Sequence, residues 1–212
     1  MHEVLANVFS GITPIEQCAY DYANRFEEIL ETTKQSIMDN TFEKCMNYLC
    51  SLEPIDEKKY EVLSVEEKLS FNIGKFRFVG YADLVLRDRQ NGEVILVDHK
   101  QANHFLKKDG TPLKNQSENF FAYKHQMYLY CKGIKDCMGL NVSRIVWNHY
   151  KDDGALTIIP YVQEDYDESM AWALDCIGRI KKDKRFGCKK SYILCSLLCD
   201  FRNDCEYLND DE

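Results

Sequence analysis

Three side chains that could cooperate in phosphate chemistry lie close together in the sequence: Asp83, Asp98 and Lys100. Each aspartate stands at or near the end of a segment that is otherwise apolar, where a buried carboxylate is costly unless it is paired or holds a metal. Because side chains alternate along a strand, Asp98 and Lys100 share one face while His99 faces the other way. The spacing therefore predicts that two carboxylates and one amine meet at an edge or kink of a sheet.

This set of side chains meets the needs of phosphodiester hydrolysis. Carboxylates bind Mg²⁺ through hard oxygen ligands, and a bound cation polarises a phosphate and lowers the pKa of a bound water. The amine of Lys100 can stabilise developing negative charge or position the attacking water. Gly80, three residues before Asp83, permits a bend or a close backbone approach. The alternative is two surface aspartates and a strand-end lysine, but the order of the surrounding elements favours the metal site.

The elements around this cluster are predicted from periodicity and turn residues. The predicted helices are 2–10, a long amphipathic segment from about 15 to 52, 117–132 and 165–182. The predicted strands are 61–71, 76–86, 94–98, 143–150 and 155–162. Residues 94–97 are apolar throughout, which is typical of a central strand buried on both faces. The order predicts an α/β fold, a mixed central sheet flanked by helices, with a core at 1–186 and a cysteine-rich tail at 187–212 packing on it.

Composition and charge narrow the class of protein. The 212 residues are 45% hydrophobic and 29% charged, which is ordinary for a folded domain. No apolar run approaches the length of a bilayer span, and no leader opens the chain, which predicts a cytoplasmic protein without a membrane partner. The net charge of −8 argues against general affinity for nucleic acid. Two basic clusters could offset it locally, or could be solvated helix faces: Lys107, Lys108, Lys114, Lys124 and Lys132, and a second between Arg179 and Lys190.

Four short motifs, taken in order, resemble the core of the RecB-like PD-(D/E)XK nucleases. They are the hairpin motif Gly80-Tyr-Ala-Asp83, the motif Asp98-His-Lys100, the helical motif Gln126-Met-Tyr-Leu-Tyr130, and His2-Glu3 on a first helix. That group includes CRISPR-associated exonucleases and the nuclease domains of recombination helicase-nucleases. The resemblance extends over about residues 2–205 and implies a restriction-endonuclease-like core.

The resemblance also implies a metal centre. Asp83 and Asp98 would be ligands of Mg²⁺ or Mn²⁺, the main-chain carbonyl of His99 a third ligand, and His2 a fourth. The side chain of His99 is expected to face away from Asp98, as the strand alternation already indicates.

Three further residues would act in catalysis according to the same resemblance. Lys100 would be catalytic, Gln126 would orient Lys100 or a DNA phosphate, and Tyr130 would contact DNA or brace the site. A glutamine among apolar neighbours needs a polar partner, which favours a site role for Gln126. At helical spacing, Tyr130 is equally well explained as a core residue.

Ten cysteines are many for a chain without a secretion signal, and they favour metal or cluster ligation over disulfides. Cys18, Cys45, Cys50, Cys131, Cys137 and Cys176 are scattered and are predicted to be small core residues. Cys188, Cys195, Cys199 and Cys205 crowd the C-terminus. The last three resemble the C-terminal ligands of the 4Fe–4S cluster that many RecB-like nucleases carry, with Cys188 or Cys18 as the fourth. Zinc and reduced structural cysteines are the alternatives.

Taken together, the sequence predicts a metal-dependent DNA nuclease, an exonuclease acting on single-stranded or duplex ends in DNA repair or recombination. The weak positive charge predicts that a helicase or a recombination protein helps to hold the DNA. Two alternatives remain: a catalytically idle DNA-binding module of the same fold, and an interaction domain stabilised by zinc or by an iron–sulfur cluster.

Overall fold

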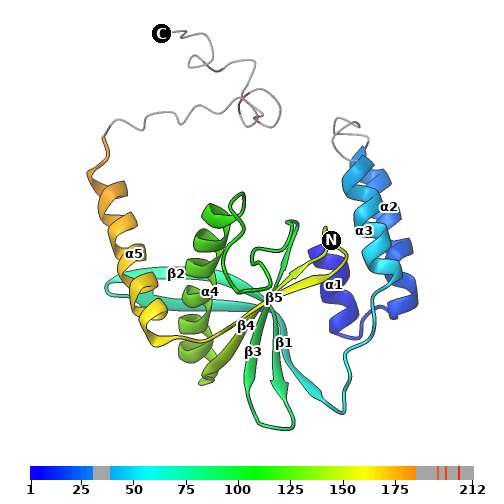
Figure 1. Ribbon diagram of the computed structural model, residues 1–212, viewed down its shortest axis with the longest axis horizontal. Coiled ribbons are helices and arrows are strands. Elements are labelled where there is room, and N and C mark those ends of the chain that lie inside the picture. Colours follow the sequence, from blue (N-terminus) through cyan, green and yellow to red (C-terminus); the bar gives the residue numbers. More distant parts are fainter. Residues whose placement is uncertain (31–38, 185–194, 196–198, 200–204, 206–212) are drawn as a thin grey trace. The chain divides into compact units, whose positions relative to one another are not determined.

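The computed structural model describes residues 1–30, 39–184, 195, 199 and 205 (Figure 1). The chain divides into two compact units, Met1–Leu174 and Asp175–Glu212. Its elements, in chain order, are α1 (His2–Phe9), a short 3₁₀ helix (Ile15–Gln17), α2 (Cys18–Leu30), α3 (Asp39–Cys50), β1 (Tyr60–Ile73), β2 (Phe76–Asp88), β3 (Val94–Lys100), α4 (Ser117–Met138), β4 (Val142–His149), β5 (Ala155–Pro160) and α5 (Gln163–Lys182).

The five strands form one mixed sheet in the order β1-β2-β3-β4-β5. The β3–β4 pair is parallel and the other three pairs are antiparallel. The parallel pair needs a crossover, and α4 supplies it. Val94–Val97 of β3 are buried, as expected for a central strand covered on both faces. The predicted α/β class with a mixed central sheet is therefore confirmed.

One face of the sheet packs against α4 and the first half of α5. The core on this side includes Leu96, Trp147, Met127, Tyr128 and Ala173. The loop at 101–116 is anchored to this core, because it inserts the fully buried side chain of Phe105. The same loop is held by the His104 Nδ1–Asp152 Oδ2 ion pair at 2.6 Å.

The N-terminal helices form a second hydrophobic cluster. The segment predicted as one helical stretch from 15 to 52 contains the separate helices α2 and α3, with residues 31–38 outside the described part. Aromatic contacts hold the two helices together: Phe26 and Phe42 have ring centroids 4.5 Å apart. Leu5 of α1 is fully buried in this cluster, which fixes α1 beside the sheet (Figure 1).

The helices α1–α5, as far as they are described, do not combine the length and apolar character that a bilayer span requires.

Candidate active site

The candidate site lies where β2 and β3 separate. Their pairing joins Leu84–Arg87 to Val94–Val97 and ends there. Asp83 and Asp98 are the next residues on the two strands. Beyond this point β2 continues in its hairpin with β1, whereas β3 continues beside β4 as far as Lys100. The structure therefore places both predicted aspartates at this fork, one residue beyond the last β2–β3 pair.

A third carboxylate, Glu66, faces the fork and was missed by the sequence reasoning. Glu66 lies opposite Asp83 in the hairpin, between the register pairs Val65–Leu84 and Glu67–Ala82. Its φ of 50° is in the left-handed region, where a residue with a side chain is strained. The sequence offers two adjacent acids here, Glu66 and Glu67, but strand alternation alone does not say which of them faces the fork.

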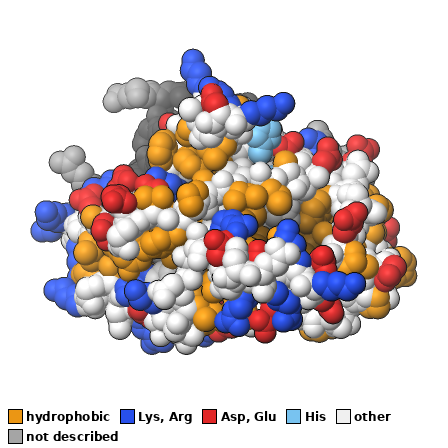
Figure 2. Space-filling view, turned by 60° about the horizontal axis from the view of Figure 1, so that its bottom comes forward, with side chains coloured by type: hydrophobic (Ala, Val, Ile, Leu, Met, Phe, Trp, Pro, Cys, Tyr) orange, Lys and Arg blue, Asp and Glu red, His pale blue; other side chains and the backbone are white. Residues whose placement is uncertain are grey.

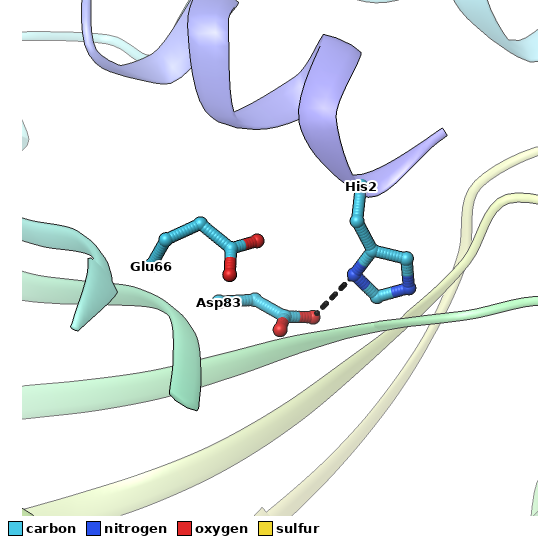
Figure 3. Close-up of side chains that lie close together, drawn as sticks. All are labelled: His2, Glu66 and Asp83. Carbon is cyan, nitrogen blue, oxygen red and sulfur yellow. Dashed lines mark ion pairs between the residues drawn. The ribbon is translucent and has the colours of Figure 1, made fainter. Parts of the chain in front are cut away.

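His2, Glu66 and Asp83 form the candidate metal-binding group (Figure 3). Each offers one ligand atom, and these atoms all lie within 4.8 Å of one another. Nδ1 of His2 is 3.3 Å from Oδ2 of Asp83, and the same oxygen accepts the main-chain N–H of His99 at 2.7 Å. Two carboxylate oxygens and one imidazole nitrogen suit a hard or borderline divalent cation such as Mg²⁺ or Mn²⁺.

The electrostatics of this group reflect two acids close together. The hydrogen bond to Asp83 raises the pKa of His2 despite partial burial. Burial and the charge of Asp83 raise the pKa of Glu66. Burial would also raise the pKa of Asp83, but the hydrogen bonds from His2 and from the N–H of His99 outweigh burial and lower it. The two carboxylates of the group therefore favour a positive charge beside them.

Asp98 and Lys100 form the other side of the site, next to α4. Nζ of Lys100 lies 2.8 Å from Oδ2 of Asp98 and donates to Oε1 of Gln126 at 3.1 Å. The ammonium also stands 4.5 Å from the ring centroid of Tyr123. Asp98 is only 3% exposed, and burial, opposed by Lys100 and reinforced by Asp83, raises its pKa to about 6. The structure thus brings together the predicted Asp98, Lys100 and Gln126.

Tyr130 connects this side of the site to the hairpin. Nε2 of Gln126 donates to the hydroxyl of Tyr130 at 2.9 Å. A Cβ atom placed on Gly80 would lie 2.6 Å from Cε1 of Tyr130. Gly80 is thus needed for close approach of the Tyr130 ring to the strand. Tyr130 is partly buried and lies between Gln126 and the strand that carries Gly80.

The side chain of His99 faces away from Asp98 and Lys100, as the strand alternation predicted, and its ring lies edge-on to that of His2 with centroids 6.4 Å apart. Its ring stacks on Phe9 with centroids 5.5 Å apart, and Nδ1 lies 3.0 Å from Nδ2 of Asn148. Burial lowers the pKa of His99 to about 4. The imidazole of His99 is therefore buried behind His2, while the main-chain N–H of His99 donates to Asp83.

The first basic cluster is partly committed to ion pairs. Nζ of Lys124 lies 2.7 Å from Oδ1 of Asp165, and Nζ of Lys132 lies 2.8 Å from Oδ2 of Asp136. On the face shown in Figure 2, basic and acidic side chains are interspersed, with hydrophobic side chains between them. Two of the lysines proposed to offset the negative charge are therefore neutralised by neighbouring acids.

The cysteines divide into described and undescribed ones. Cys195, Cys199 and Cys205 are partly buried in the second unit, whereas the predicted ligand Cys188 lies outside the described residues. Their ligation of a cluster stays a prediction.

The predicted burial of the scattered cysteines is confirmed for Cys18, Cys45 and Cys131. It is wrong for Cys50 and Cys137, which are exposed. Cys50 ends α3, and Cys137 contacts the outer edge of β1 at Ser70, so both lie at the rim of the packed layers.

Comparison with known proteins identifies the family. The family model of the PD-(D/E)XK nuclease superfamily matches residues 1–206, and the chain belongs to this superfamily. The crystal structure of a "putative exonuclease" from Eubacterium rectale is similar, with a TM-score of 0.52 and 14% identity, over 95% of this chain and 71% of that one. At this identity the likeness supports the fold alone. No curated protein matches the sequence.

Proposed function

We propose that this chain is a divalent-metal-dependent deoxyribonuclease that degrades DNA from its ends. The observation that carries the proposal is the meeting, at one fork of the sheet, of a carboxylate–imidazole group with a buried aspartate–lysine pair. Membership of the PD-(D/E)XK superfamily supports the hydrolysis of phosphodiester bonds.

Each residue of the site has a separate proposed role. His2, Glu66 and Asp83 would hold the cation together with Asp98 and the carbonyl of His99. A bound cation would polarise the phosphate and lower the pKa of a coordinated water. Lys100, oriented by Asp98 and Gln126, would stabilise negative charge developing on the phosphate. The imidazole among carboxylates favours Mn²⁺ over Mg²⁺, because Mg²⁺ prefers an all-oxygen shell.

The test of this proposal is a nuclease assay on matched DNA substrates. Linear single-stranded, linear duplex and closed circular DNA are incubated with the protein and Mn²⁺, Mg²⁺ or a chelator. We expect loss of linear substrates, protection of the circles, and a higher rate with Mn²⁺. Cutting of the circles would reject action from ends, and undiminished cutting with chelator would reject the metal.

An idle DNA-binding module is less well supported, because the described site keeps both aspartates at the fork and holds the lysine in contact with Asp98 and Gln126. The interspersed surface charge supports the proposal that a helicase or recombination protein holds the DNA during repair or recombination. Low affinity of the isolated protein for duplex DNA at physiological salt, rising when such a partner is added, is the expected result in a binding titration.

For the tail we propose a 4Fe–4S cluster held by Cys195, Cys199 and Cys205, with Cys188 as the fourth ligand. The support is the crowding of thiols in a short segment. Iron and sulfide analysis of protein purified without oxygen should find about four of each per chain. Zinc in a colourless protein would point instead to a structural zinc site.

A further inference from the structure

The hairpin of β1 and β2 extends beyond the fork with one face against α4, while the other face is exposed among the residues that the structure describes. The covered face buries Leu69 and Phe71. The uncovered face is formed by three cross-strand pairs of exposed residues, which we call the hairpin track: Lys68–Tyr81, Ser70–Val79 and Asn72–Arg77.

The hairpin track carries apolar side chains that the core does not use. Tyr81 is 49% exposed and Val79 is 55% exposed. They are neighbours at alternate positions of β2, so both project from the same face. An exposed ring beside an exposed aliphatic side chain is a surface on which a flat apolar group can stack.

The charges of the hairpin track are positive, in contrast to the net charge of −8 of the chain. Lys68 and Arg77 are its charged residues, and none of its six positions is acidic. Nε of Arg77 donates to Oγ of Ser70 at 3.1 Å, which holds the guanidinium on this face. Cations beside an exposed ring fit a ligand that alternates anionic groups with flat rings.

The spacing of the hairpin track connects it to the metal-binding group. Tyr81 precedes Asp83 by two residues on the same strand, a separation of about 6.8 Å along the strand axis. This distance is comparable to the separation of successive phosphates in an extended single strand of nucleic acid. A base stacked on Tyr81 would therefore place a neighbouring phosphate beside Asp83.

We propose that the hairpin track binds single-stranded DNA and directs its scissile phosphate to the fork. Tyr81 and Val79 stack on unpaired bases, and Lys68 and Arg77 contact phosphates. Duplex DNA does not fit this mode, because its base faces are stacked on one another. The inference rests on the proposed function, since it assigns the strand preference of that same site.

The test measures binding to a labelled single-stranded oligonucleotide by fluorescence anisotropy, in a Lys100→Ala background with Mn²⁺ to prevent cutting. Tyr81→Ala should weaken binding about tenfold, whereas Tyr81→Phe, which keeps the ring, should bind as the parent does. The matched control is Tyr20→Ala, since Tyr20 is 65% exposed on α2, away from the hairpin track. Binding of a blunt duplex should not change with Tyr81→Ala.

A second measurement tests the cations. The double substitution Lys68→Ala and Arg77→Ala should reduce the slope of log Kd against log salt by about 1.4, because each phosphate contact on a single strand contributes about 0.7. An unchanged slope, equal losses on single strands and duplex with Tyr81→Ala, or tighter binding of RNA than of DNA would each overturn the inference.

Cleavage of DNA by the parent protein is measured separately, so that the failure of the proposed function can be told from the failure of this inference. Tyr81-dependent binding without cleavage would reject the proposed nuclease and keep the hairpin track, whereas cleavage indifferent to Tyr81 would reject only the hairpin track.

Discussion

The two sides of the candidate site differ in how their charges are held. On the Lys100 side, contacts run from Asp98 through Lys100 and Gln126 to Tyr130, so each of these four side chains has a protein partner. On the His2 side, Glu66 and Asp83 face each other and share one half-exposed imidazole. The comparison indicates that the protein itself orients the lysine, whereas the carboxylate–imidazole group requires added positive charge to be balanced.

The largest expected effect is the loss of the ammonium on the Lys100 side. Lys100→Ala should reduce the rate of DNA hydrolysis by at least about 10³-fold, because charge developing on the phosphate loses its stabilising partner. Circular dichroism should show an unchanged fold. Lys58→Ala, at an exposed lysine ahead of β1, is the matched control and should cut as the parent does. Cutting by Lys100→Ala at the parental rate would remove this residue from the mechanism.

A smaller loss is expected when the brace behind the lysine is displaced. Gly80→Ala should lower kcat about 10- to 100-fold with little change in KM, because the new methyl group displaces Tyr130 and, through Gln126, shifts Lys100. Gly178→Ala is the control, since a Cβ there meets nothing within 4 Å. Equal kinetics for the two alanine variants would show that the chain of contacts does not position the lysine.

The His2 side should respond to metal concentration rather than to the chemical step. Glu66→Gln should raise the Mn²⁺ concentration for half-maximal activity about tenfold, with the rate at saturating Mn²⁺ within a few-fold of the parent, because one anionic ligand is lost. Glu67→Gln, at the adjacent acid, is the matched control. If both glutamine variants need the same Mn²⁺ as the parent, Glu66 is not a ligand.

The smallest expected effect is on the free energy of unfolding. It should rise when Asp98 on the Lys100 side is neutralised and fall when Asp83 on the His2 side is neutralised. The pKa of Asp98 is about 6 in the fold against about 3.9 in an unfolded chain, so ionisation of Asp98 destabilises the fold as pH rises from about 4 through 6. Without metal at pH 7.5, Asp98→Asn should therefore raise the free energy of unfolding by about 1–2 kcal/mol, a gain that disappears near pH 4. Asp83→Asn should lower it, because the pKa of Asp83 is depressed. Urea denaturation at both pH values measures this, and a destabilised Asp98→Asn at pH 7.5 would contradict it.

The sheet and the Lys100 side were predictable because local patterns determine them. The apolar run at 94–97 marks a central strand in any register, and the Asp98-x-Lys100 spacing places both side chains on one face of any regular strand. The role of Gln126 was implied by the resemblance to the RecB-like nucleases and was supported by its place among apolar neighbours. These features depend on residues close together in the sequence, and so the sequence carries them.

The features that the sequence did not predict depend on tertiary packing. The helix predicted to end at residue 132 continues to Met138, because Gly133 admits Leu69 and Phe71 against the helix. Gly139, with φ of 70°, is the residue that ends it. Glu66 reaches the site only through its left-handed backbone, which breaks the strand alternation on which sequence reasoning relies.

The fork gives the site a mechanical asymmetry. Asp83 belongs to a hairpin whose outer half is not paired with β3, while Asp98 belongs to a strand enclosed between its neighbours. Tension on the outer half of the hairpin therefore acts first on Asp83, and it reaches β3 through the hydrogen bond from the N–H of His99 to Asp83. Such a force would change the distance between the carboxylates of Asp83 and Asp98. A ligand that pulls on the hairpin would thereby change the geometry in which the two acids bind a cation.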